Sequence, residues 1–103
     1  MTQIDRITEM EKCFDASRAA ADRLEEALEE YEAILKSYKK LSDYYGSPRW
    51  IKDFEDDEAG KLPKDLKRGV LSEDSVYDLL TDNREIYRKM MKIISRALDQ
   101  NLL

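Results

Sequence analysis

Residues 7–46 read ITEMEKCFDASRAAADRLEEALEEYEAILKSYKKLSDYYG, and they decide the fold because apolar side chains recur here with a period of seven. A first row contains Ile7, Phe14, Ala21, Leu28 and Leu35. A second row contains Met10, Leu24, Tyr31, Tyr38 and Tyr45, and a third contains Cys13, Ala20, Ala27, Ile34 and Leu41. Together the three rows predict one long helix with a wide apolar stripe. A charged row borders the stripe and contains Glu11, Arg18, Glu25, Glu32 and Lys39.

Both ends of this helix carry the usual signals. Thr2 is a suitable N-cap, and Asp5 places negative charge in the first turn. Gly46 is the expected stop, and neither proline nor glycine interrupts the residues before it. We therefore predict a helix over about 2–45, with a length of about 65 Å at 1.5 Å per residue.

Residues 46–69 contain every glycine and both prolines of the chain, so the segment after Gly46 reads as a connector over about 47–69. Ser47 is positioned to cap a short helix with Pro48 at its first position. Trp50 and Phe54 are four residues apart and share one face of that helix. One further turn is predicted over 63–68, ended by Gly69.

A second long helix is predicted over about 73–100. Ser72 is its expected N-cap, and Leu71 and Val76 are spaced as a hydrophobic staple. Its apolar stripe contains Val76, Leu79, Leu80, Ile86, Tyr87, Met90, Ile93, Ile94 and Ala97. Asn83 lies within this stripe, as a residue that sets the register or as a surface residue displaced by local rotation. Glu85 and Lys89 are spaced to form an ion pair.

Two long amphipathic helices joined by a compact connector predict an all-α fold, an antiparallel helical hairpin with one or two short connector helices. The chain, residues 1–103, is expected to form a single helical domain. Two helices alone seldom bury enough apolar surface to form a stable fold, and the first helix is longer than the second. A homodimer that completes a four-helix bundle is therefore expected.

Composition restricts the function. The net charge of −5 argues against general affinity for nucleic acid or anionic membranes. The chain has no histidine, which removes the commonest general base and metal ligand. The single Cys13 excludes an intrachain disulfide, fits a reducing compartment, and is expected to be a small buried apolar residue. No apolar run approaches the length of a membrane span, so we expect a cytoplasmic protein without membrane contact.

The acidic run DFEDDE, residues 53–58, is the one candidate metal site. Its oxygen ligands would suit magnesium or calcium, but the calcium-loop pattern fails because Glu58 and Lys64 stand where that loop needs glycine and glutamate. A solvated helix end is the favoured interpretation, and a carboxylate metal site is the alternative. No cofactor is expected.

A cluster of basic residues in the connector is the main candidate for binding. Two interpretations of Trp50 stand open: a stacking platform beside these cations, or a plug at the end of the hairpin. The candidate partner-binding residues are Trp50, Asp53, Lys64, Lys67 and Arg68. We predict a non-enzymatic, self-associating interaction or scaffold protein whose connector meets an unidentified protein partner. The alternative is binding of nucleic acid or another anion through the basic connector and last helix.

Residues 44–80, YYGSPRWIKDFEDDEAGKLPKDLKRGVLSEDSVYDLL, resemble the core of a family of small bacterial proteins catalogued as domain of unknown function 4298. The resemblance extends over nearly the whole chain. It is concentrated in Tyr44 to Gly46, Trp50, Gly60, Leu62, Pro63, Leu66 to Ser72 and Tyr77 to Leu80. It implies a bacterial cytosolic protein and brings no activity, substrate or catalytic residue.

Overall fold

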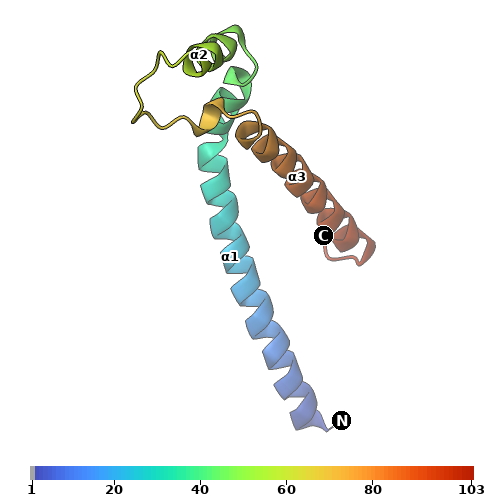
Figure 1. The fold of residues 1–103 in the computed structure, drawn as a ribbon. Helices are drawn as coiled ribbons and strands as arrows, with labels where there is room; N and C mark the ends of the chain where they lie inside the picture. The colour runs from blue at the N-terminus through green and yellow to red at the C-terminus, as the bar shows by residue number, and fades with distance from the viewer. Residues whose placement is uncertain (1) are drawn as a thin grey trace. The chain divides into compact units, whose positions relative to one another are not determined.

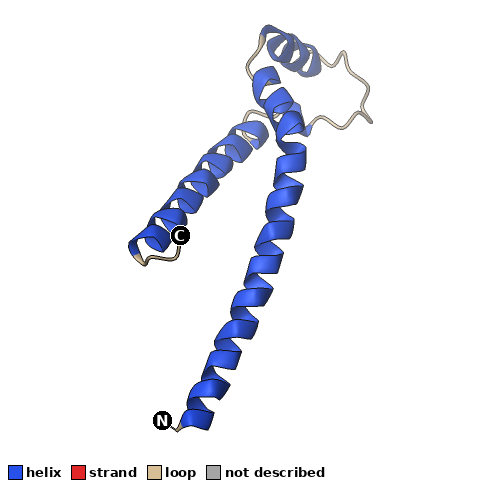
Figure 2. Cartoon of the chain, turned by 180° about the vertical axis from the view of Figure 1, so that it is seen from behind, coloured by secondary structure: helices blue, strands red, loops and turns tan. Residues whose placement is uncertain are grey.

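The structure is a computed structural model that describes residues 2–103, so the first residue of the predicted domain lies outside it. Three α-helices and a short 3-10 helix follow one another: α1 (Gln3–Tyr44), α2 (Pro48–Glu58), η1 (Gly69–Leu71) and α3 (Ser75–Asp99) (Figure 1). Figure 2 shows helix and loop but no strand in this part of the chain. The predicted all-α class, with two long helices and a short connector helix, is confirmed.

The chain divides into two compact units, Met1–Tyr38 and Lys39–Leu103. The first unit consists of α1 up to Tyr38, and the second contains the last turns of α1 and every later element. The apolar residues that are buried in the described chain are Leu71 and Val76, and both belong to the second unit. The core that a single chain forms is therefore small and lies around the connector.

Reciprocal hydrogen bonds cap the start of α1 as predicted. The Asp5 backbone N–H donates to Thr2 Oγ1 at 3.1 Å, and the Thr2 N–H donates to Asp5 Oδ2 at 3.3 Å. The helix then continues for 42 residues without a break. Gly46 ends it with a φ of +76°, a left-handed conformation that glycine adopts at little cost.

The predicted start of α2 is also confirmed. Ser47 Oγ accepts a hydrogen bond from the Trp50 N–H at 3.2 Å, and Pro48 occupies the first turn, where its missing N–H costs nothing. Gly60 follows the helix with a φ of +71°. Sequence-local signals therefore set both ends of α2.

Two boundaries in the connector differ from the prediction. The extra turn expected over 63–68 is present as a single turn that is not helical, in which the Leu66 N–H donates to the Pro63 carbonyl at 3.2 Å, and Gly69 begins the 3-10 helix η1 and does not end a helix. The last helix starts at Ser75 and not at Glu73, because Ser72 Oγ accepts the Ser75 N–H at 3.1 Å and residues 73–74 form a turn before the helix. The η1 segment, which contacts both α2 and α3, brings Leu71 into the core with Val76.

The start of α3 is tied to the end of α1 within the second unit. Tyr45 Oη donates to the Glu73 carbonyl at 3.1 Å. Farther along α3, Asn83 is 5% exposed and its Nδ2 donates to the Leu79 carbonyl at 2.9 Å, so it lies on the buried side of the helix. The expected Glu85–Lys89 pair is replaced by a pair between Glu85 and Arg88.

Candidate functional site

Trp50 anchors the connector through its ring. Its indole N–H donates to the Val70 carbonyl at 2.9 Å. Its ring stacks on Phe54, with centroids 5.3 Å apart and planes at 20°, and meets Tyr45 edge-on at 5.1 Å. These contacts join α2, η1 and the end of α1. The Trp50 ring therefore contacts other residues of its own chain, as expected for the interpretation as a plug.

Asp53 is held by a short hydrogen bond. The Tyr44 hydroxyl donates to Asp53 Oδ2 at 2.6 Å, and both side chains are half-buried. Burial, the hydrogen bond and the charge of Asp53 raise the pKa of Tyr44 to about 12. The phenol therefore stays protonated at neutral pH and fixes α2 against the end of α1.

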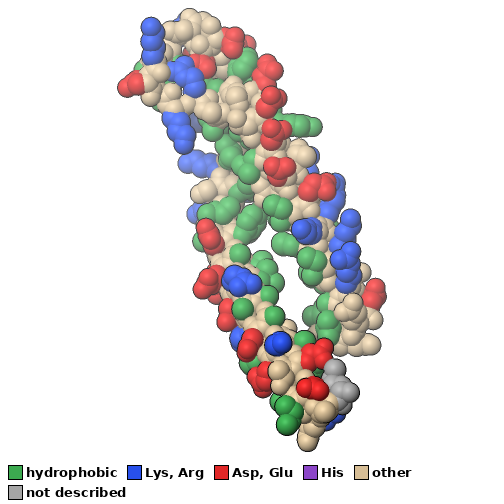
Figure 3. All heavy atoms as spheres, turned by 60° about the horizontal axis from the view of Figure 1, so that its bottom comes forward, with side chains coloured by type: hydrophobic (Ala, Val, Ile, Leu, Met, Phe, Trp, Pro, Cys, Tyr) green, Lys and Arg blue, Asp and Glu red, His purple; other side chains and the backbone are tan. Residues whose placement is uncertain are grey.

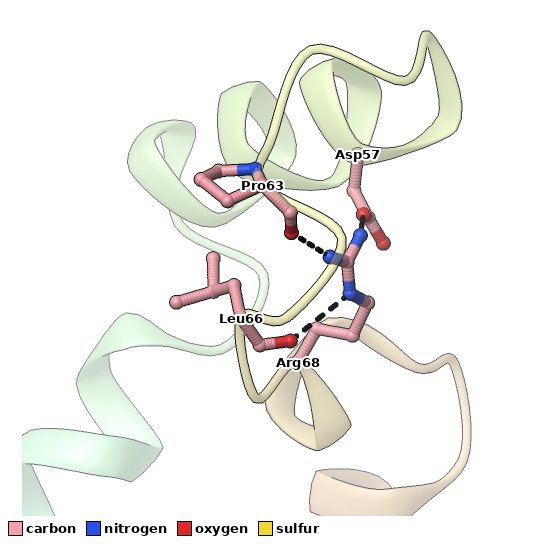
Figure 4. Close-up of polar contacts among 4 residues, drawn as sticks. All are labelled: Asp57, Pro63, Leu66 and Arg68. Carbon is pink, nitrogen blue, oxygen red and sulfur yellow. Dashed lines mark hydrogen bonds and ion pairs between the residues drawn. The ribbon is translucent and has the colours of Figure 1, made fainter.

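Arg68 closes the loop between α2 and η1. Its guanidinium forms an ion pair with Asp57 and donates to the Pro63 carbonyl, and its Nε donates to the Leu66 carbonyl at 3.2 Å (Figure 4). Figure 4 shows the three acceptors gathered around one side chain, and we call this arrangement the Arg68 clasp (Asp57, Pro63, Leu66 and Arg68). The clasp uses the planar, forked donor geometry that distinguishes arginine from lysine.

One more carboxylate of the acidic run is engaged locally. Asp56 pairs with Lys52 at 3.0 Å and with Lys61 at 3.8 Å. Within residues 2–103, no group of three or more acidic, cysteine or histidine residues is arranged to hold a metal ion. Asp56 and Asp57 thus act as partners for cations of the same chain.

Lys64 and Lys67 differ from the other candidate residues. Both are exposed, and neither forms an ion pair with any residue in the described range. Lys67 lies at a groove of about 390 Å³ whose other lining residues are mostly apolar. The lining consists of Leu41, Lys67, Gly69, Val70, Ser75, Val76 and Leu79. We call this feature the Lys67 groove. Its apolar lining suits an apolar side chain of a ligand, and Lys67 suits a carboxylate beside that side chain.

The apolar stripe of α1 is uncovered in the single chain. Phe14 is 63% exposed and Leu24 is 58% exposed, and Cys13, which was expected to be buried, is exposed as well. Hydrophobic side chains, green in Figure 3, accordingly lie open at the surface. The later half of α3 has the same property, since Ile93 and Ile94 are each 53% exposed. Cys13 is exposed because the stripe to which it belongs has no cover.

The structure engages three of the five predicted binding residues internally, namely Trp50, Asp53 and Arg68, and leaves two open, Lys64 and Lys67. The sequence reasoning missed two contacts that build this surface, Tyr44 with Asp53 and Tyr45 with Glu73. Their spacing of nine residues in one case and 28 in the other has no local pattern, so only the presence of two adjacent tyrosines before Gly46 offered a signal.

Comparison with known proteins places the chain in a family. The model of the family described as Domain of unknown function (DUF4298) matches residues 7–93, which include α1 from its second turn, the connector and most of α3. The chain therefore belongs to the DUF4298 family. Comparisons with curated proteins and with solved structures found no match. No helix of the described residues has both the length and the apolar character that crossing a membrane requires.

Proposed function

We propose that this chain is a non-enzymatic helical interaction protein that self-associates through the stripes of α1 and α3. The open stripe of α1 carries the proposal. The large aliphatic side chains and Phe14 in the heptad rows from Ile7 to Leu35 are exposed in the single chain, although their spacing is that of helices packed on other helices.

The small amount of apolar surface that a single chain buries supports an assembly. Burying a leucine or phenylalanine side chain fully contributes about 1.5–3 kcal/mol, whereas the described single chain buries only Leu71 and Val76 among its apolar residues. Net stabilities of domains are about 5–15 kcal/mol. A second copy is the cover that is always present wherever the chain is made, and two-fold pairs are the commonest assembly of soluble proteins.

The connector supports a binding role more than a chemical one. Asp53, Asp57 and Arg68, which are the charged groups best placed for chemistry, hold the fold together through Tyr44 and the Arg68 clasp. The chain has no histidine. The groups left open are Lys64, Lys67 and the groove beside Lys67, and this combination suits a protein segment with an apolar side chain and a nearby carboxylate. The exposed thiol of Cys13 favours a reducing compartment such as the cytoplasm.

Sedimentation of the full chain over a wide concentration range tests self-association. We expect a dimer that dissociates on dilution. The double variant Phe14→Glu, Leu24→Glu places charges on the stripe and should leave a monomer. Its matched control, Ala19→Glu with Ala33→Glu, adds the same charge on the opposite face of α1 and should behave as the wild type. A wild-type chain that is monomeric at every concentration overturns the proposal.

The connector surface has a separate test. The chain is immobilised as the wild type, as Lys64→Glu with Lys67→Glu, and as the control Lys12→Glu with Lys40→Glu, which makes the same charge change on the outer face of α1. We expect proteins retained from native cytosol by the wild type and the control to be lost only with the connector variant. Identical retention by all three would remove the connector surface and leave self-association standing.

A further inference from the structure

Charged rows at the edges of the two long helices have complementary signs. On α1 the row that borders the apolar stripe contains Arg18, Glu25 and Glu32, each seven residues after the last. On α3 the corresponding row on the other edge contains Asp82, Lys89 and Arg96, again seven apart. Read in the same direction, the signs are plus, minus, minus on α1 and minus, plus, plus on α3. All six side chains are exposed.

Most of these charges have no partner in the single chain. Arg18 forms an exposed pair with Asp22 at 2.7 Å. The other five residues of the two rows form no ion pair with any residue from 2 to 103. The apolar residues next to the rows are open too, since Leu24 is 58% exposed and Ile93 is 53% exposed. The rows thus border two surfaces that both lack a cover.

The rows match only when the two helices run parallel. In a parallel pair of helices, the heptad position e of one helix faces position g of the other, and these positions form ion pairs between helices. The charged row of α1 is at position e, and the charged row of α3 is at position g. Reversing one helix exchanges its edges. The charged row of α1 would then face the row of Leu80, Tyr87 and Ile94 on α3, which offers no opposite charge.

One chain cannot make this parallel pair by itself. The bond of 3.1 Å from Tyr45 Oη to the Glu73 carbonyl places the start of α3 at the end of α1. Parallel neighbours need the start of one helix near the start of the other. The start of α1 is about 60 Å away along the helix at 1.5 Å per residue, so α3 of the same chain begins at the wrong end.

We infer that α3 of each copy packs parallel to α1 of a second copy, with Arg18, Glu25 and Glu32 facing Asp82, Lys89 and Arg96 of that copy. This inference rests on the proposed self-association and specifies its geometry. The arrangement is reciprocal, so each pair occurs twice in a two-fold dimer. The ion pairs set the register and direction, and the apolar stripes between them supply most of the free energy of association.

Charge reversal with subunit mixing tests the inference. One variant is Glu25→Lys with Glu32→Lys, and the other is Lys89→Glu with Arg96→Glu; lysine and glutamate are both strong helix formers, so the helices are kept. Each variant alone should dissociate with a Kd at least about tenfold higher than the wild type, because attractive pairs become repulsive. An equimolar mixture of the two should regain wild-type affinity, measured by sedimentation equilibrium.

Matched controls make the same charge changes on the outward faces, as Glu26→Lys with Glu29→Lys and as Arg88→Glu with Lys92→Glu. These controls should associate as the wild type does. If they weaken association as much as the edge variants, net charge is the cause and the inference fails.

Two further outcomes separate this inference from the proposed function. Edge variants that dimerise as tightly as the wild type would show that the rows lie outside the interface. A second outcome is that a chain with all four reversals regains wild-type affinity, whereas the mixture of the two double variants does not. That outcome would place the contact within one chain. Either result overturns the parallel arrangement while self-association remains. A wild-type chain that never associates overturns the proposed function itself.

Discussion

The two units of the chain are held in different ways. In the second unit, polar bonds join segments that are distant in sequence, such as Trp50 with Val70 and Tyr45 with Glu73. In residues 2–38, side-chain bonds such as Thr2 with Asp5 and Arg18 with Asp22 join residues three or four apart on α1. The connector therefore carries its own tertiary structure, whereas this part of α1 has a helix's local bonds and an uncovered stripe.

This difference indicates which interactions stabilise each of the two units. Most helical stability in proteins comes from packing of an apolar face and less from intrinsic propensity. If a second copy supplies that face for α1, the stability of residues 2–38 depends on protein concentration, and that of the connector does not. The predictions below test this contrast from the largest effect to the smallest.

Leu28→Asp should have the largest effect, because it places a charge in the middle of the α1 stripe. We expect a loss of about 3 kcal/mol per chain in the associated state. The melting temperature should lose its dependence on concentration, as measured by circular dichroism. Ala33→Asp adds the same residue to the outer face and should cost less than 1 kcal/mol, about the helix propensity difference. Equal losses for the two variants would contradict a packed stripe.

Trp50→Ala should destabilise the connector by about 2–3 kcal/mol, since it removes a ring stacked on Phe54 and the indole hydrogen bond to Val70. Denaturant unfolding followed at several concentrations should give the same loss at each. Trp50→Phe keeps an aromatic ring without the indole N–H and should lose less than Trp50→Ala, with about 1 kcal/mol of the loss from the missing hydrogen bond. A loss that grows on dilution would place Trp50 in the assembly.

Arg68→Ala should cost about 2 kcal/mol, because Asp57 and two carbonyl groups lose their donor in a partly exposed loop. The neighbouring Lys67→Ala is the control and should change the free energy of unfolding by less than about 0.5 kcal/mol. Chemical denaturation of both variants measures the contrast. Arg68→Lys should recover little, since lysine lacks the forked donor geometry.

Tyr44→Phe should have the smallest effect at neutral pH, about 1 kcal/mol for the lost bond to Asp53. The pKa of Tyr44 in the folded chain is about 12, above its ordinary value of 10.0. Its stabilising contribution is therefore complete below pH 10 and is lost as the pH rises toward 12. The difference in unfolding free energy between wild type and variant should shrink over that range. Tyr77→Phe removes the same hydroxyl group at a residue 57% exposed, and as a control it should change the free energy of unfolding at neutral pH by less than about 0.5 kcal/mol.

Much of this architecture follows from local sequence signals. Thr2 and Ser47 act at helix ends through bonds to residues three positions away, and Gly46 acts through a left-handed backbone conformation, so their roles were predictable. The start of α3 was predicted two residues early, because Ser72 reaches Ser75 and the two acidic residues between them form a turn.

The candidate site was predictable in composition but not in geometry. Trp50, Asp53 and Arg68 stand out as unusual residues, yet their internal partners depend on tertiary structure. The partners of Trp50 and Arg68 depend on how the loop of residues 59–68 folds back, and the partner of Asp53 depends on the turn between α1 and α2. No spacing rule predicts that an arginine will meet the carbonyls of Pro63 and Leu66. The exposure of Cys13 was missed for a related reason, since burial of a stripe depends on a surface that the single chain does not contain.

The Arg68 clasp also bears on how readily proteases cleave the loop before Arg68. Lys61, Lys64 and Lys67 lie in the loop before Arg68, and each is a cleavage point for a trypsin-like enzyme. Such enzymes bind their substrates extended, with backbone carbonyls available to them, but the guanidinium occupies those of Pro63 and Leu66. We therefore expect this lysine-rich loop to resist trypsin in the folded chain and to be cut faster in the Arg68→Ala variant.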